Sequence, residues 1–446
     1  MMQSPIRIMS PDITVAGQSA PGGGILISGL NDSGEGLMIN THDVVVQYIR
    51  VRMGLNTSRP PGSQSGSPIW IGNGDVYNVV VDHCSFSWTT DENVTFWMNT
   101  PGFANHNISI QWSTIGEGLQ GHSTDLITGS SVGLFDQETD IDMHHNFWAN
   151  SSHRRPLLKN KSTRLVNNII YNSNFYSTEA LGGIVLDVIG NLYREGSLID
   201  GVHEIQLSEV DSGDGPSGTP SVYLAGNKGW HQLNSQGDQW VMAARVTSEN
   251  GSETGPAPSN FQRSSPAASE KFPIRVDDVN NLESLLLPMT AAHPVGASQG
   301  LSCTGGWLMN RDAVDARLVE DYNAGAGSIP TSQNDVGGFP TIAAGTPCAE
   351  SLHDGISDAW KISKQLSTTD AGLYKAIAPN GFTYLENYLN GTDPNTLVIA
   401  RVVSPASGRL RNPLVELASQ LWMARLPLGS GFIGSWVQAT LRRDYK

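Results

Sequence analysis

Four short apolar runs, each with one asparagine at the same place, decide the fold of this chain. They are IDMHHNFW at residues 141–148, RLVNNIIYN at 164–172, IVLDVIGNLY at 184–193 and VYLAGN at 222–227. The equivalent positions are Asn146, Asn168, Asn191 and Asn227, with steps of 22, 23 and 36 residues between them. In a solenoid such residues form a ladder in which each amide hydrogen-bonds the next coil. An ordinary turn role explains one asparagine, but not the shared register.

Similar runs occur earlier in the chain and extend the repeat toward the N-terminus. They are VVVQYIRVR at 44–52, VVVDHCSFSW at 79–88 and ISIQWSTI at 108–115. A repeat of this length is typical of a solenoid or a propeller, but a propeller blade needs four strands and each repeat here has one clear strand motif. The 48 Gly, the 24 Pro and the low charged fraction of 15% agree with short strands joined by tight turns. The sequence therefore predicts an all-β fold, a right-handed parallel β-helix.

The composition changes along the chain and predicts four regions. The β-helix is expected over 1–247, and a stretch rich in Ser, Pro and Gly predicts a loop or linker with little structure of its own over 248–290. Helical spacing in RDAVDARLVEDYN and GFTYLENYLNG predicts a small, partly helical C-terminal extension over 291–396. Residues 397–446 form an atypical basic tail, which is either a partner-binding helix or a non-native end.

Charge and cysteine content exclude some functional classes. The net charge of -15 argues against nucleic-acid binding, which needs a concentrated basic surface. No apolar run of the length that spans a membrane occurs, and the first residues lack the pattern of a signal peptide. Three cysteines cannot build a disulfide framework, although Cys303 and Cys348 could pair in an oxidising compartment.

Three carboxylates stand close together in DHCSFSWTTDE at residues 82–92. A strand followed by a turn could bring Asp82 and Asp91 to one face, with Glu92 beside them. Clustered carboxylate oxygens suit calcium, which accepts waters and irregular geometry. The alternative is that these are solvated acids of a turn.

A basic cluster follows the strand motif at 141–148. Arg154, Arg155 and Lys159 can hold a carboxylate through a guanidinium fork and an ammonium group, or form a surface ion-pair patch. His144 and His145 are adjacent on a strand and point to opposite faces, so they do not easily bind one metal ion. One of the two is expected to be a buried structural histidine.

Several motifs, taken in order, resemble polysaccharide lyase family one, the pectate lyases. They are ITVAGQSAPGGGILISG from residue 13, YIRVRMG, VVVDHCSFSWTTDENVTFW, ISIQWSTIGEGLQGHS and HHNFWANSSHRRPLLK, with RDAVDARLVEDYN, VGGFP, DGISDAW and GFTYLENYLNG in the C-terminal part. The resemblance covers about residues 11–395. It implies a secreted, monomeric enzyme that cuts acidic plant cell-wall polysaccharide by calcium-assisted β-elimination to unsaturated oligogalacturonides.

The family's site residues can be carried over by position. Its catalytic arginine, two residues before a proline, falls on Arg154, and its second basic residue falls on Lys159. Its calcium-binding acids fall on Asp82 and Asp91. The resemblance implies that calcium and Lys159 lower the pKa of Arg154 enough for it to act as a base.

The chain departs from the family pattern at several places. Thr95 replaces a further acid, so the calcium site is either completed by Glu92 and waters or weaker. A lysine of the next coil aligns with Gln120, which leaves His122 as a candidate to bind the substrate carboxylate. The N-terminal cap and signal peptide of the family are also expected to be missing.

Other functions stay open at this point. They are a glycoside hydrolase on the same scaffold, a noncatalytic carbohydrate-binding β-helix and a lyase inactivated by truncation. Pectate is expected as the substrate because a site bridged by an ion needs free carboxylates. Methylated pectin, another uronate polymer, and endo or exo attack are not distinguished by the sequence.

Overall fold

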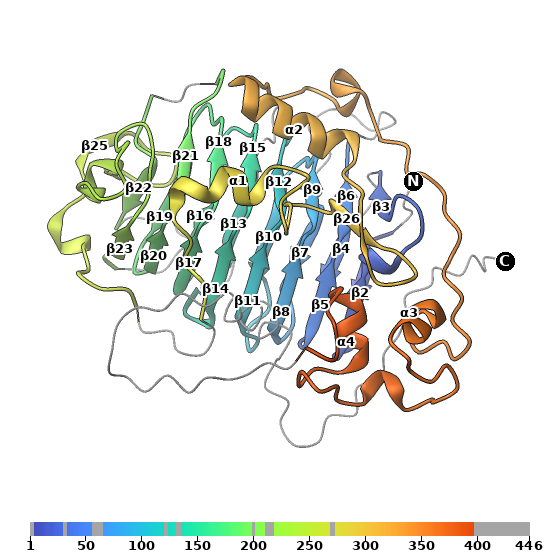
Figure 1. Cartoon of the computed structure of the whole chain (residues 1–446). Helices are drawn as coiled ribbons and strands as arrows, with labels where there is room; N and C mark the ends of the chain where they lie inside the picture. The colour runs from blue at the N-terminus through green and yellow to red at the C-terminus, as the bar shows by residue number, and fades with distance from the viewer. Residues whose placement is uncertain are drawn as a thin grey trace.

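In the computed structural model the chain winds into stacked coils, shown in Figure 1. The structure describes residues 4–29, 34–55, 66–119, 124–130, 135–198, 201–209, 218–267 and 273–396. The tail 397–446 and the candidates Gln120 and His122 lie outside these residues. Within them, no helix is long and apolar enough to cross a membrane.

The coils build three sheets, named A, B and C here. Sheet A contains, in order, β1 (Ile6–Ile8), β4 (Leu37–Ile39), β7 (Ile69–Ile71), β10 (Glu92–Met98), β13 (Thr124–Ser130), β16 (Leu157–Leu158), β19 (Thr178–Leu181), β22 (Ile205–Ser208), β24 (Ala243–Val246) and β25 (Glu253–Pro256). Sheet B contains β2 (Ile13–Ala16), β5 (Val44–Gln47), β8 (Val76–Asp82), β11 (Asn105–Gln111), β14 (Glu138–His144), β17 (Ser162–Val166), β20 (Val185–Ile189) and β23 (Ser221–Ala225). Sheet C contains β3 (Ile25–Ser28), β6 (Ile49–Arg52), β9 (Ser85–Ser87), β12 (Thr114–Gly116), β15 (Phe147–Ala149), β18 (Ile169–Tyr171) and β21 (Leu192–Arg194).

The first seven coils each contribute one strand to sheets A, B and C in turn, and equivalent strands of successive coils pair in parallel. Ile108 of β11, for example, pairs with Val79 on one side and Ile141 on the other. The inward-facing residues are Val, Ile, Leu, Phe and Met, which stack along the axis as one continuous core. The predicted parallel β-helix with a small, partly helical C-terminal extension is confirmed.

The asparagine ladder predicted from the sequence is present in the interior of the coil stack. Nδ2 of Asn146 donates to Oδ1 of Asn168 at 3.0 Å, Asn168 to Asn191 at 2.9 Å, and Asn191 to Asn227 at 3.1 Å. Gln239 ends the ladder, because its Oε1 accepts from the backbone N–H of Asn227 at 2.7 Å. All five side chains are buried, so these bonds satisfy polar groups that water cannot reach.

An aromatic stack follows the same coils at the corner between sheets B and C. Tyr48, His83, Trp112 and His145 each occupy this corner with left-handed backbone, at φ between 50° and 56°. Their successive ring centroids are 4.8, 5.8 and 4.5 Å apart. His145 also bonds Asp277 at 3.1 Å, and its buried neighbour His144 lies 3.0 Å from it, Nδ1 to Nδ1. Both histidines are therefore buried structural residues, where one was expected.

The C-terminal extension and the helix just before it pack on sheet C. Figure 1 shows the helices α1 (Leu282–Leu286) and α2 (Ala313–Ala324) across this face. Leu318 and Tyr322 of α2 pack in one cluster with Phe147. Buried Arg52 adds ion pairs to Asp312 at 2.9 Å and Asp315 at 3.0 Å.

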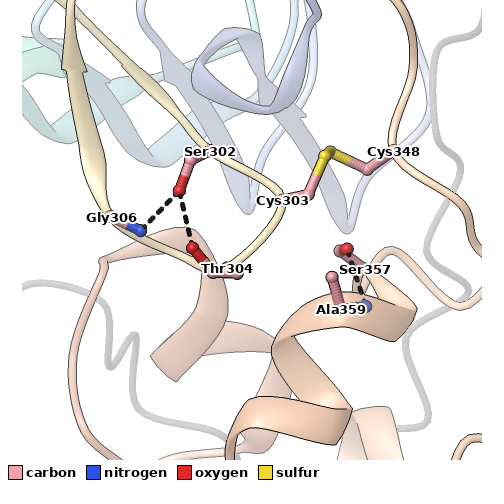
Figure 2. Close-up of a disulfide and its surroundings, with 7 residues drawn as sticks. All are labelled: Ser302, Cys303, Thr304, Gly306, Cys348, Ser357 and Ala359. Atoms are coloured by element: carbon pink, nitrogen blue, oxygen red, sulfur yellow. Dashed lines mark hydrogen bonds between the residues drawn. A yellow bond between two sulfur atoms is a disulfide. The ribbon is translucent and has the colours of Figure 1, made fainter.

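The rest of the extension contains two further helices, a short hairpin and a disulfide. The elements are β26 (Gln299–Leu301), β27 (Trp307–Met309), α3 (Asp358–Ser363) and α4 (Tyr384–Leu389). Figure 2 shows Cys303, in the turn after β26, bonded to Cys348. Ser302 Oγ lies 2.9 Å from the N–H of Gly306 in the same turn. The disulfide between Cys303 and Cys348, which the sequence left open, is therefore present.

Among the described residues, the 3-10 turns are η1 (Gly17–Ser19), η2 (Phe135–Gln137), η3 (Gln239–Met242), η4 (Ser259–Phe261), η5 (Val279–Asn281), η6 (Gln333–Val336) and η7 (Leu373–Lys375).

The stretch from residue 248 differs from the linker that its composition predicts. Strand β25 pairs antiparallel with β24 and covers the end of sheet A. Phe261 is fully buried in the main core, and the N–H of Arg263 donates to the carbonyl of Val222 at 2.7 Å. A covered edge has fewer unpaired backbone groups that could associate with another chain. The content of Ser, Pro and Gly does not predict this cover.

We expect Asn168→Ala to lower the free energy of unfolding by about 3 kcal/mol, because it leaves buried partners on both neighbouring coils unsatisfied. The measurement is urea unfolding followed by circular dichroism. Asn174→Ala is the control, because Asn174 is exposed on the same coil and should change stability by less than about 0.5 kcal/mol. Equal effects of the two substitutions would contradict a structural role for the ladder.

Candidate active site

A cavity of about 480 Å³ lies on the outer face of sheet A. Strands β7, β10 and β13 and the segments flanking β16 form its floor, and the chain after β24 forms one wall. The residues that line it are Trp70, Asp91, Glu92, Thr95, Trp97, Ile127, Arg154, Lys159, Glu249 and Asn250. We call this cavity the sheet A groove.

Strand alternation explains why these side chains face outward. Val94 and Phe96 are fully buried in the core, so Thr95 and Trp97 between and after them point away from it. Parallel register then places Trp70 and Ile127 beside Thr95 on the neighbouring strands. One outward residue position, repeated over successive coils, thus forms the middle of the groove floor.

Two cations and two carboxylates form a connected group in the groove. Arg154 donates through Nη1 to Glu92 and through Nη2 to Glu249, the latter at 3.4 Å. Lys159 Nζ donates to the other oxygen of Glu249 at 2.8 Å. Within the part of the chain that the structure describes, Nε of Arg154 is buried and has no hydrogen-bond partner.

Arg154 and Arg155 are adjacent but play different parts. Arg154 has left-handed backbone with φ of 58°, and its side chain faces the groove. Arg155 is turned into the interior, where it bonds Asp125 at 2.9 Å, the carbonyl of Tyr171 at 2.8 Å and Ser173 at 3.0 Å. It is fully buried, so the substrate contact expected of Arg155 is not available to it.

Asp82 does not lie with Asp91 and Glu92, contrary to the expected calcium set. It ends β8 in sheet B, whereas Asp91 and Glu92 start a strand of sheet A in the following coil. Its carboxylate accepts from Gln47 at 2.9 Å and from Gln111 at 3.1 Å, and it bonds His83 at 2.8 Å. This is a buried structural role at the corner of the helix.

The remaining donors fit a calcium ion in part. Asp91 and Glu92 are neighbours at the groove, and Glu249 is held by Lys159 and Arg154. Among the described residues, no group of three or more His, Cys, Asp or Glu side chains forms a metal site. Asp91 and Glu92 could therefore supply two oxygen ligands, and the rest would come from substrate or water.

The ionisation of the groove follows from its burial. The pKa of Glu92 is raised to about 8: burial is the main cause and nearby Asp91 adds to it, while the Arg154 guanidinium opposes both. Burial lowers the pKa of Arg154, but the charge of Glu92, followed by Tyr176 and Glu249, outweighs burial and leaves it above the ordinary value. With these ion pairs in place, Arg154 stays protonated.

Half of the residues that line the groove were not found from the sequence: Trp70, Trp97, Ile127, Glu249 and Asn250. Trp70 and Trp97 are half-buried on its floor, and Trp97 lies so close over Gly129 that a Cβ there would be 2.7 Å from its ring. The alternation of inward and outward residues along the strand 92–98 could have predicted that Trp97 faces outward. Glu249 had no such signal, because it lies in the stretch taken for a linker.

We expect Glu92 to make the protein less stable as pH rises from about 5 to 8. Over this range the unfolded carboxyl, with its ordinary pKa of 4.5, has lost its proton while the folded one keeps it. Urea unfolding of Glu92→Gln should therefore depend less on pH than that of the unchanged protein. The control is Glu320→Gln, on an exposed residue of α2. An unchanged slope in the Glu92 variant would contradict the raised pKa.

Comparison with known proteins adds an independent observation. No family model matches the chain. The probable pectate lyase C of Neosartorya fischeri is 27% identical over 396 residues, which covers 87% of this chain and 80% of that protein. The protein of the same description from Aspergillus flavus is 27% identical over 398 residues, with the same coverage.

Solved structures with some similarity include a pectate lyase bound to a hexasaccharide, with a TM-score of 0.37 and 14% identity over 59% of this chain and 63% of that one. Another is jun a 1, the major allergen from cedar pollen, with a TM-score of 0.36 and 15% identity over 63% of this chain and 76% of that one. The similarity covers most of both chains and agrees with the ordered motifs: the chain is similar to fungal proteins described as probable pectate lyases.

Proposed function

We propose that this protein is a polysaccharide lyase that cleaves polygalacturonate by β-elimination in the sheet A groove. The observation that carries the proposal is the pair of Arg154 and Lys159, held beside one another through Glu249 on the floor of an open groove. The sequence similarity to pectate lyases supports the same activity. Arg154 is the proposed base and Lys159 the proposed binding group for the substrate carboxylate.

The proposed reaction breaks the glycosidic bond without adding water across it. Arg154 takes the proton from the carbon next to the uronate carboxylate, a carbon–carbon double bond forms, and the neighbouring glycosidic oxygen leaves and takes a proton from solvent. Charge builds up on the carboxylate during this step. Lys159 would stabilise that charge as a positive group already in place.

Arg154 must first be released from its carboxylate partners. Glu92 and Glu249 keep it protonated, and a substrate carboxylate that binds Lys159 would displace Glu249 from both cations. At a pH below the pKa of an arginine, its deprotonated, reactive fraction increases tenfold for each unit by which the pH rises. We therefore propose an activity that increases into the alkaline range.

Calcium is proposed as a cofactor held by Asp91, Glu92 and the substrate's own carboxylates. A bound calcium ion would neutralise these carboxylates and repel the proton on Arg154. Asp82 is not part of this proposal, because its carboxylate is occupied in sheet B.

The substrate and location are also proposals. The basic pair in the groove agrees with an acidic plant cell-wall polysaccharide as the substrate, and pectate with free carboxylates is the proposed one. The protein is proposed to act as a monomer. Secretion is supported by the disulfide between Cys303 and Cys348, because such bonds persist in oxidising compartments.

A noncatalytic carbohydrate-binding protein is the second candidate. The observation that favours it is the raised pKa of Arg154, which holds the proton that catalysis must remove. Such a protein would bind polygalacturonate without producing the ultraviolet-absorbing unsaturated ends.

We expect Arg154→Lys to lower kcat at least about a hundredfold, because the shorter ammonium group misplaces the base. The measurement is the ultraviolet absorbance of unsaturated product from polygalacturonate. Arg164→Lys is the matched control, since Arg164 is another half-buried, ion-paired arginine of the next strand, bonded to Asp142 and outside the groove. Near-full activity of the Arg154 variant would contradict its role.

We expect a chelator to abolish the activity and added calcium to restore it. Asp91→Asn should raise the calcium concentration needed for half-maximal activity about tenfold or more, because it removes one of two protein ligands. Asp82→Asn should leave that concentration unchanged. Full activity after chelation would contradict the calcium proposal while leaving the lyase assignment intact.

A further inference from the structure

A second cavity, of about 390 Å³, lies at the N-terminal end of sheet A. Arg7 of β1 and Met38 of β4 form part of its lining, and the turns that follow the strands contribute Asn40, Asn73 and Phe103. Arg7 is exposed. The cavity thus combines the Arg7 guanidinium, amide groups, apolar surface and one acid, Asp75. The guanidinium suits the carboxylate of a charged sugar, and the amides and apolar surface suit its hydroxyl groups and ring faces.

The second cavity continues the sheet A groove. Parallel register places Arg7 beside Met38, Met38 beside Trp70, and Trp70 beside Thr95. Met38 lines the second cavity and Trp70 lines the groove, and the two residues are paired on adjacent strands. The same outward row of residues forms both floors.

Electrostatic contact supports this continuity. Glu35, just before β4, is half-buried, and burial raises its pKa. Arg7 lowers the pKa of Glu35 and Asp91 raises it. The Glu35 carboxylate therefore interacts electrostatically with Arg7 of the second cavity and with Asp91 of the groove.

The distances match a sugar polymer. Neighbouring strands are about 4.8 Å apart, so the five steps from β1 to β16, next to Arg154 and Lys159, span about 24 Å. A pyranose unit in an extended chain covers about one such step. A chain that runs from the basic pair to Arg7 therefore needs about five to six units on that side of the pair, so a hexamer can reach Arg7 and a trimer cannot.

We propose that Arg7 forms a distal subsite that binds the carboxylate of a uronate unit several residues away from the cleaved bond. This proposal rests on the proposed function, since it assigns the second cavity to the same acidic polymer. Met38 and Phe103 would contact the sugar faces, and Asn40 and Asn73 would bind hydroxyl groups. The subsite would increase affinity for long chains without touching the reacting atoms.

The test compares Arg7→Gln with the unchanged protein on trigalacturonate and on polygalacturonate. We expect KM for the polymer to rise about two- to fivefold, the size of an exposed charge contact, with kcat unchanged and the trimer unaffected. Arg7→Lys should recover most of the loss, and added salt should shrink it. Lys161→Gln is the matched control, because it removes one exposed positive charge bonded to Asp136, outside both cavities.

Three results would overturn the proposal: no change in KM with the polymer, an equal change with the trimer, or the same change in the Lys161 variant. A binding readout separates this proposal from the lyase assignment. In an Arg154→Lys background, titration calorimetry with hexagalacturonate should show weaker binding when Arg7 is also replaced. If the unchanged protein cleaves nothing but this difference persists, the lyase assignment fails and the distal subsite stands.

Discussion

Hydrogen bonds between buried asparagines of successive coils are the constraint on which the rest of this structure depends. Asn146, Asn168, Asn191 and Asn227 each bond the next coil, so a slip of one residue would leave buried amides without partners. The locked register also aligns the outward positions of sheet A. Residues far apart in sequence, such as Glu92 and Arg154, therefore meet in one groove.

Under the proposed function, one set of ion pairs in the groove both positions the cations and restrains the base. Glu92 and Glu249 hold Arg154 and Lys159 in position, and the same contacts keep Arg154 protonated. An anionic polymer is the natural competitor for these cations, because its carboxylates can replace those of the protein. The site is thus suited to a substrate that supplies its own negative charge.

The fold and the basic pair were predictable because they depend on local pattern. Strand repeats and the aligned asparagines predicted the coils, and motif order pointed to Arg154 and Lys159. The expectation for Asp82 was wrong because sequence proximity to Asp91 does not reveal that the chain passes through sheet C between them. Arg155 was misjudged because neighbouring residues face opposite ways, and Glu249 could not be found because a distant return of the chain brings it to the groove.

The central claim is that this groove breaks a uronate polymer by elimination. The most direct measurement is mass spectrometry of the fragments formed from polygalacturonate in oxygen-18-labelled water. Elimination predicts that the fragment with the new non-reducing end is one water lighter than its hydrolytic counterpart, and that no label enters at the cleaved bond. Fragments of full mass that carry oxygen-18 at the new reducing end would contradict the account and indicate a hydrolase.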